Sequence, residues 1–396
     1  MPPAPLPAAA IDANQELIDV PLLAPESRPG RYQFTDFNPV EGGERWQPSF
    51  TFDVPETWGS GIYAMKCEAS DGAVHYVPFV VNPPPGSAAK LALLANINTW
   101  TAYNYWGGYS RYGLGGTGPA QFSVKRPNFI LFGANTYNTD QYNCRHLIRG
   151  ELWLLNWLLE NGYEVDVWTD LDFHNGINRL QDYSAIILSA HPEYWSVKMM
   201  DSLKAYLDGG GHLINLGANG VYDAVDISDD FSRITVYGAY GTGRTNLFRQ
   251  IGQPESVVLG IAFPWKGDDV GNCPSRPVPY TPVDLGHPFM AGIAAGDGIS
   301  AQGWSYPTDG PPGPACAAGW EADVIDEWSP PDLRILASAT LYNPHGLELD
   351  VHLVTYDHPG GGWVFSGGSM AFTGSVPVDP KTQRIVRNIL DAALAG

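Results

Sequence analysis

The order of apolar and polar positions predicts alternating strands and helices over residues 87–396. Continuous apolar runs at Leu91–Ala95 and Ser184–Ala190 are typical of strands buried on both faces. Leucines and other apolar residues recur with helical spacing in Leu147–Glu160 and Val197–Asp208, and a glycine follows each segment. This alternation indicates parallel βαβ units, with helices covering both faces of one sheet. Further strands are expected at Tyr163–Trp168, His212–Leu216, Leu333–Ala339, Val351–Tyr356 and Gly362–Phe365, and a last helix at Pro380–Ala393.

The first 86 residues follow a different pattern, dominated by β-forming residues. Segments at Pro48–Val54, Gly61–Cys67 and Val74–Val81 alternate or cluster these residues, and Asp71-Gly72 is a hairpin signal between the last two. Three consecutive prolines at 83–85 then interrupt the pattern. We therefore predict a small all-β, sandwich-like module over residues 1–86. An α/β domain with a mostly parallel sheet is expected to follow over residues 87–396.

The composition narrows the classes of partner. The chain has 396 residues with 22 Lys and Arg against 42 Asp and Glu, a formal charge of −20. Sparse basic residues argue against nucleic acid or an anionic membrane as partners, and 12% aromatic residues argue against a disordered chain. No apolar run approaches the roughly 18 residues that span a bilayer, and the first residues lack the pattern of a secretory signal. Four scattered cysteines suit a reducing compartment, so we expect a cytoplasmic protein.

Three loops are candidates for a functional site because each follows a predicted parallel strand. In open α/β sheets, ligands bind beyond the carboxyl ends of the strands. Asn96–Trp106, His191–Ser196 and Gly217–Gly220 hold that position, and each combines polar or ionisable side chains with aromatic residues or glycines. We expect the three loops to open on the same edge of the sheet.

His191-Pro192-Glu193 is the most distinctive of these segments. Proline disfavours helical backbone at His191, and in extended backbone the side chains at i and i+2 point the same way. Histidine and glutamate on one face suit either metal ligation or general acid–base catalysis. Alternatively, His191 caps the following helix and Glu193 stabilises its N-terminal dipole. The spacing alone leaves both interpretations open.

Other motifs are weaker. Gly113–Gly118 fits a dinucleotide-binding pattern but follows no strand, so no dinucleotide site is expected there. Cys144-Arg145-His146 is interpreted as a helix start rather than a thiol–base pair. Asp166, Asp170, Asp172 and His174 are interpreted as an acidic loop after a strand, which makes it a candidate for a supporting role at the site.

Several segments of the chain resemble the large subunit of N,N-dimethylformamidase. The most specific is His191–Ser196, with the sequence HPEYWS, followed by Gly217–Tyr222 and preceded by Trp168–His174. The resemblance runs from about residue 45 to the end of the chain. It implies an amidotransferase-like or flavodoxin-like α/β fold in which His191-Pro192-Glu193 occupies the turn of the usual nucleophilic cysteine. Weaker matches in the same order are Ser60–Ala64, Val77–Val80, Asn98–Asn104 and Val364–Ser369.

The resemblance also implies a mononuclear iron, Fe³⁺, held by two tyrosines and one glutamate. Glu193 matches the carboxylate ligand, while His191 and Asn219 match a histidine and an asparagine beside the metal. Tyr103 and Tyr112 are the best matches to the two tyrosines, and Tyr105 is an alternative to either. The chain departs from the family where the second tyrosine motif is shortened and where Gly-Ala-Asn-Gly replaces Gly-Gly-Asn-Gly. It also shows no counterpart of the family's large N-terminal region.

These observations lead to three hypotheses about function. The first is an iron-dependent hydrolase of the C–N bond of a small linear amide, N-substituted or not, in which His191 moves a proton and Asn219 stabilises the oxyanion. The second is a non-catalytic protein that binds a carbohydrate or another ligand on an amidotransferase-like scaffold. The third is a glycan-active hydrolase that uses Asp170, Asp172 and Glu193. A homo-oligomer and a small accessory subunit both remain open.

Overall fold

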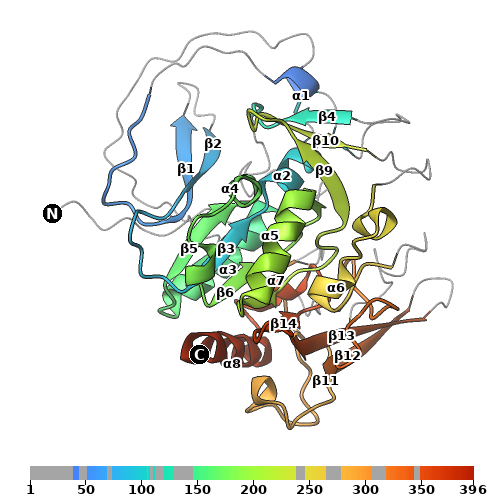
Figure 1. The fold of residues 1–396 in the computed structure, drawn as a ribbon. Coiled ribbons are helices and arrows are strands. Elements are labelled where there is room, and N and C mark those ends of the chain that lie inside the picture. Colours follow the sequence, from blue (N-terminus) through green and yellow to red (C-terminus); the bar gives the residue numbers. More distant parts are fainter. Residues whose placement is uncertain are drawn as a thin grey trace.

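A mixed eight-stranded sheet lies at the centre of the molecule and carries helices on both faces (Figure 1). The computed structural model describes residues 39–43, 51–68, 74–104, 106–107, 110–111, 120–127, 146–237, 246–264, 278–305, 318–342 and 348–396. The strand order is β11 (Thr281–Pro282), β12 (Arg334–Tyr342), β13 (Glu348–Asp357), β14 (Trp363–Ser366), β8 (His212–Asn215), β6 (Ala185–Leu188), β3 (Leu91–Ala95) and β5 (Val165–Thr169).

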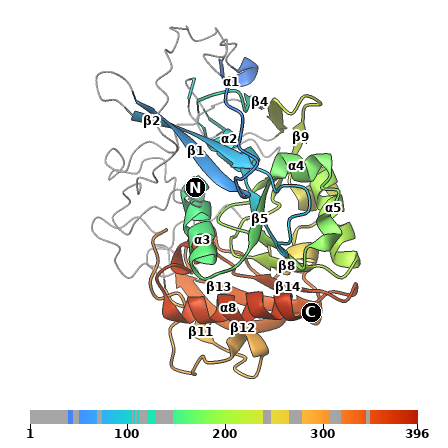
Figure 2. The same cartoon turned by 90° about the vertical axis from the view of Figure 1, so that its left-hand side faces the viewer.

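The half of the sheet from β14 to β5 is parallel, as the apolar runs predict. Its strands are buried because helices pack on both faces, and successive side chains of a strand point to opposite faces. Leu93 thus joins the core cluster under one set of helices, whereas Leu94 joins the cluster under the other. Figure 2 shows α3 and α8 on the same face. The first set is α3 (Ile148–Glu160), α7 (Phe372–Ser375) and α8 (Pro380–Ala395); the second is α4 (Asp170–Asn175), α5 (Val197–Asp208) and α6 (Ser256–Leu259).

The sheet as a whole is not mostly parallel, and that prediction is wrong. β14 pairs antiparallel with β13, β13 with β12, and β12 with β11. Only five residues, 343–347, connect β12 to β13. A parallel connection needs a dozen residues or more, so these two strands can pair with each other only in antiparallel fashion. The similarity to an amidotransferase fold stays a prediction.

A second, four-stranded sheet is built from the loops that follow the parallel strands. Its order is β4 (Ala120–Ser123), β10 (Arg233–Val236), β9 (Asp223–Ile227) and β7 (Tyr194–Trp195). β7 starts directly after Glu193, and β9 starts a few residues after β8. The stretch after β3, which was expected to be a loop over Asn96–Trp106, instead begins with the short helix α2 (Ile97–Tyr103). This sheet and α2 therefore frame the edge where the candidate loops emerge.

The described part of residues 1–86 contains a hairpin rather than a two-layer sandwich. β1 (Gly61–Glu68) and β2 (Val74–Val81) pair antiparallel along their full length, and α1 (Pro39–Gly42) is a single turn. Residues 51–54 form no strand, and 48–50 lie outside the described residues. The two predicted strands around Asp71-Gly72 are thus confirmed. The domain boundary at residue 86 stays a prediction.

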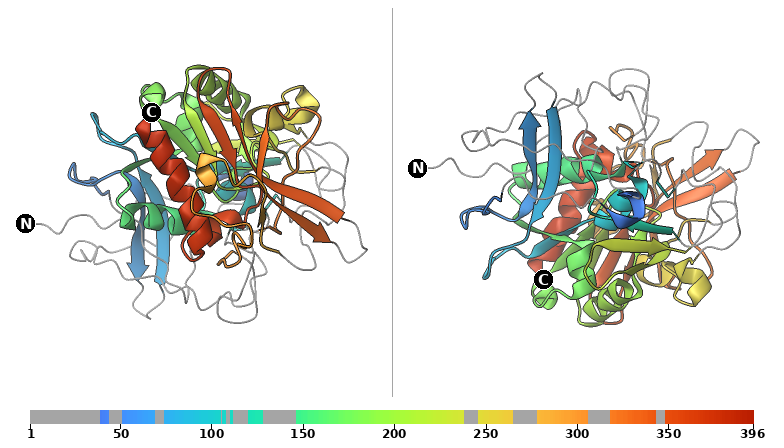
Figure 3. Two further views of the ribbon diagram at one scale, coloured as in Figure 1. Left: turned by 90° about the horizontal axis from the view of Figure 1, so that it is seen from below. Right: turned by 90° about the horizontal axis from the view of Figure 1, so that it is seen from above.

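The hairpin packs against the β5 edge of the large sheet (Figure 2 and Figure 3). The hydroxyl of Ser60 accepts a hydrogen bond from the backbone N–H of Val167 at 2.7 Å. Trp58 stacks on Tyr63 with ring centroids 4.6 Å apart, and Tyr63 stacks on Phe79 at 5.9 Å. These aromatic contacts supply apolar burial to a hairpin that is too small to be stable alone.

None of the helices in the described part of the chain combines the length and apolar character that crossing a bilayer requires. Of the four cysteines, Cys67 is exposed, and the other three lie outside the described residues.

A buried carboxyl group on α3 should make stability depend on pH. Glu151 is fully buried, and burial raises its pKa to about 8, although hydrogen bonds from Trp100 and Asn96 oppose the shift. Because the folded state holds this proton more tightly than the unfolded chain, the contribution is complete below about pH 4.5 and is lost as the pH rises through 8. The free energy of unfolding should fall by about 1.4 kcal/mol per pH unit in that window through this group.

Glu151→Gln should remove that part of the slope, measured by urea unfolding between pH 5 and 8. Glu160→Gln, the same change at an exposed position of the same helix, is the control. Identical slopes in the wild type and Glu151→Gln would contradict the prediction.

Candidate active site

Three predicted residues meet at the carboxyl edge of the parallel strands. His191 follows β6, and Asn219 follows β8. His191, Glu193 and Asn219 have 0%, 4% and 4% of their surface exposed. The expectation that these loops open on one edge is confirmed by the contacts among them.

The imidazole of His191 lies between two carboxylates. Its Nε2 atom is 3.2 Å from Oε2 of Glu193 and 3.0 Å from Oε2 of Glu321. The amide nitrogen of Asn219 donates to the same Glu321 oxygen at 2.7 Å and lies 3.4 Å from His191 Nε2. Because carboxylates only accept hydrogen bonds, this geometry assigns the proton to Nε2.

Glu321 is the member of this cluster that the sequence analysis missed. Its segment is held by the turn after β14: Met370 N–H donates to the Trp320 carbonyl at 3.0 Å, and Asp323 N–H donates to the Gly368 carbonyl at 2.9 Å. Glu321 thus reaches the same edge as the other residues without following a strand of the parallel sheet itself. The signal that was available is the position of that turn at the end of a parallel strand.

The backbone is strained at this cluster. Ala190, Asn219 and Glu321 adopt φ values of 53°, 46° and 41°, in the left-handed region that residues with a Cβ rarely occupy. They make up half of the six non-glycine residues with positive φ in the described ranges. Such strain costs on the order of 1–3 kcal/mol per residue and concentrates at functional sites.

The charges in the cluster favour a protonated His191 paired with an ionised Glu321. Burial alone would lower the pKa of His191, but the charges of Glu321 and Glu193 outweigh it and raise that pKa above its usual value. Burial would raise the pKa of Glu321, yet the charge and hydrogen bond of His191 and the bond from Asn219 bring it below the usual range. Burial raises the pKa of Asp323 to about 8, so this neighbouring group is largely neutral at pH 7.

Tyr103, the last residue of α2, lines the same cluster. Its ring centroid is 5.6 Å from that of His191 and 4.8 Å from that of His146. His146 also contacts Trp320 edge-on at 4.8 Å. The interpretation of residues 144–146 as a helix start agrees with α3, which begins at Ile148, but His146 in addition packs within the candidate site.

Several predicted features lie outside the described residues. These are the candidate tyrosines Tyr105 and Tyr112, the glycine motif Gly113–Gly118 and Cys144. Arg111, directly before Tyr112, is described, and its N–H donates to the Ala102 carbonyl of α2 at 2.9 Å.

Comparison with known proteins identifies the family of the chain. The family model described as N,N-dimethylformamidase beta subunit-like, C-terminal, matches residues 25–384. The chain belongs to this family. Beta subunits of N,N-dimethylformamidase from an Alcaligenes species and from Paracoccus aminophilus are each 30% identical to it in an alignment of length 216 that covers 46% of this chain. The matched region spans only 28% of each relative.

One solved structure, a cytoplasmic protein from Salmonella typhimurium, aligns with 61% of this chain and 85% of its own chain. Its TM-score of 0.33 and identity of 14% are too low to carry any argument.

The helix-cap interpretation of His191 is wrong for this member of the dimethylformamidase family. Ser196 is the N-cap of α5, because its hydroxyl accepts from the Met199 N–H. Glu193 instead donates its backbone N–H to the hydroxyl of Thr99 at 3.2 Å. The side chains of His191 and Glu193 contact each other within the cluster.

The acidic side chains that follow β5 accept hydrogen bonds at the starts of two helices, α2 and α4. Asp170 accepts from the Asn98 N–H at 2.7 Å, and Asp172 forms a capping box with Thr169 at the start of α4. His174 Nδ1 lies 2.7 Å from the Ser196 hydroxyl. These contacts argue against Asp170 and Asp172 as the acids of a glycan hydrolase.

The donor set of the cluster suits a hard cation. Among the described residues, no group of three or more His, Cys, Asp and Glu side chains is arranged to hold a metal. Glu193, which is buried, and Glu321, whose side chain is 16% exposed, bring two carboxylates against one imidazolium, which leaves an excess of negative charge in the cluster. Such an excess is costly unless a cation balances it. Glu193 and Tyr103 therefore fit the expected ligand types.

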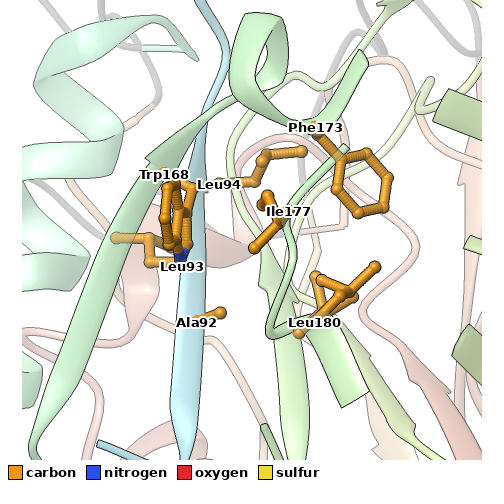
Figure 4. Close-up of a pocket in the computed structure, with 8 residues that line it drawn as sticks. Ala92, Leu93, Leu94, Trp168, Phe173, Ile177 and Leu180 are labelled. Atoms are coloured by element: carbon orange, nitrogen blue, oxygen red, sulfur yellow. The ribbon is translucent and has the colours of Figure 1, made fainter. Parts of the chain in front are cut away.

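A separate apolar cavity lies between β3, β5 and α4 (Figure 4). Its volume of about 10 Å³ is at the lower limit of what one water molecule requires. Aliphatic and aromatic side chains line it, including Leu94, Trp168 and Phe173. We interpret it as a packing gap within the core.

Proposed function

We propose that this chain is an iron-dependent hydrolase that cleaves the C–N bond of a small linear amide. The observation that carries the proposal is the strained, largely buried cluster of His191, Glu193, Asn219 and Glu321 within the region that matches the family model. The two curated relatives are named for N,N-dimethylformamidase, which supports an amide substrate.

The metal would be held by Glu193 and Tyr103, with Tyr112 or Tyr105 as the second tyrosine. Carboxylate and phenolate oxygens are hard donors, the type that suits Fe³⁺. When bound, a ferric ion supplies Lewis acidity that polarises an amide carbonyl and lowers the pKa of water.

The chain's own side chains would handle the proton. Water adds to the carbonyl carbon, the C–N bond breaks, and one proton must move from the water to the leaving amine. His191 Nε2 and Glu321 Oε2, 3.0 Å apart, form a pair that can take up and return that proton. Asn219 orients Glu321 through one N–H and keeps a second N–H for the developing oxyanion.

A variant of Asn219 tests this role without disturbing the backbone. Asn219→Gly keeps the left-handed conformation and removes the amide, so kcat should fall by about 10²-fold while iron content stays unchanged. Phe231→Gly, the same type of change at another positive-φ residue, is the control and should behave like the wild type. A fall in kcat of less than about threefold for Asn219→Gly would contradict the role.

The reaction itself is tested with small substrates. Iron-loaded protein should release amine from N-substituted formamides, detected by mass spectrometry. Hydrolysis of glycosides, or saturable sugar binding without amine release, would contradict the proposal and favour one of the alternatives.

Assembly follows as a further expectation. The relatives are named beta subunits, which denotes components of multi-subunit proteins. We expect this chain to work as a homo-oligomer or with an accessory subunit, and native mass spectrometry separates the two.

A further inference from the structure

Helix α2 links two of the residues proposed to hold the metal. Tyr103 is its last residue, and two of its polar side chains contact the segment that carries Glu193. The Thr99 hydroxyl accepts from the Glu193 N–H at 3.2 Å, and the Asn98 amide donates to the Tyr194 carbonyl at 3.1 Å. The helix thus sets the distance between the Tyr103 and Glu193 backbones.

The N-terminus of α2 is anchored by two buried carboxyl groups. Oε1 of Glu151 accepts from the Asn96 amide and from the Trp100 indole, each at 2.9 Å. Oδ2 of Asp170 accepts from the Asn98 N–H at 2.7 Å. The bond to Asp170 satisfies a backbone N–H group that a helix start would otherwise leave without a partner, and the bonds to Glu151 hold two side chains of the same helix start.

The C-terminus of α2 is anchored by a buried guanidinium. Arg126 has 7% of its surface exposed, and its Nη2 donates to the Thr101 carbonyl at 2.7 Å. Its Nη1 donates to the carbonyls of Asn104 at 2.9 Å and Trp106 at 3.2 Å, and Nε donates to Ser123 at 2.8 Å. A positive charge at this end complements the helix dipole, and only the planar fork of arginine reaches these carbonyls together.

We propose that α2 is a fixed spacer between Tyr103 and Glu193, and that Arg126 and Thr99 are positioning residues of the metal site. A helix of seven residues is too short to hold its place alone, so its position depends on these anchors. The inference rests on the proposed function, because it concerns the geometry of the same metal site. Neither Arg126 nor Thr99 is a ligand in this account.

Iron affinity of folded variants tests the Thr99 contact. Thr99→Val keeps the shape but removes the acceptor for the Glu193 N–H, whereas Thr99→Ser keeps the acceptor. Thr99→Val should weaken the Kd for Fe³⁺ by about 10- to 100-fold and shift the visible phenolate-to-iron band, and Thr99→Ser should match the wild type. Circular dichroism establishes that each variant is folded.

Arg126→Lys tests the other anchor in the same titration. Lysine keeps the positive charge but lacks the planar guanidinium fork, so we expect the same loss of affinity for Fe³⁺, about 10- to 100-fold. Arg179→Lys should bind iron with wild-type affinity. Arg179 is a suitable control because it also donates to a backbone carbonyl, that of Ser87 at 2.7 Å. If Arg126→Lys does not fold, the comparison of Thr99→Val with Thr99→Ser is sufficient to test the proposal.

The outcomes separate the two proposals. Wild-type iron binding with unchanged affinity in Thr99→Val and Arg126→Lys would overturn the spacer role and leave the proposed function standing. A wild-type protein that binds no iron would overturn the proposed function, and the spacer role with it.

Discussion

Glu193→Gln should lose iron and catalysis together. The substitution keeps the size of the side chain and the backbone N–H that donates to Thr99, but it replaces a carboxylate with a neutral amide. An amide is a weak ligand for a hard cation, so we expect less than about one tenth of the wild-type iron content. With the Lewis acid gone, kcat/KM for amide hydrolysis should fall by at least about 10³-fold.

Iron content by mass spectrometry and amine release, measured on the same preparation, check this result. Glu164→Gln, at an exposed position, is the control and should keep the wild-type iron content and the wild-type rate of amine release. A Glu193→Gln protein that holds a full complement of iron, or that turns over normally, would remove Glu193 from the ligand set.

Glu321→Gln should separate catalysis from metal binding. One oxygen of Glu321 accepts from both His191 and Asn219, so the neutral amide weakens the attraction that keeps His191 protonated. We expect kcat to fall by about 10²- to 10⁴-fold, the usual contribution of a general acid–base group, with iron content unchanged. Single-turnover kinetics on iron-loaded protein measures this directly.

Glu327→Gln, an exposed change on the same segment, is the matched control. Loss of iron in Glu321→Gln would make Glu321 a ligand rather than a proton carrier. Normal turnover would take it out of the reaction altogether.

The apolar pattern was sufficient to predict the parallel half of the fold. The strand Leu91–Ala95 and the helix Val197–Asp208 were predicted with the bounds that the structure shows. Periodicity reports burial, however, and not strand direction, so the antiparallel pairs of β12 and β13 were missed. The strands of the second sheet were missed because each has five residues or fewer and its pattern is short and mixed.

The sequence predicted only those residues of the candidate site that follow the ends of parallel strands. His191, Glu193 and Asn219 follow parallel strands, and the structure brings them together. Glu321 follows no such strand; it is more than a hundred residues from Asn219 and reaches the site through hydrogen bonds to the turn after β14. The sequence around Glu321 itself carries no signal for a contact of that kind, and the only indication was indirect: the turn that holds its segment follows a parallel strand.

The central claim is a ferric site built from Glu193 and tyrosine oxygens, and metal analysis of the purified wild-type protein tests it most directly. We expect about one iron per chain and a broad visible absorption band that disappears on reduction or chelation. Protein without iron that still hydrolyses small amides at full rate would contradict the account.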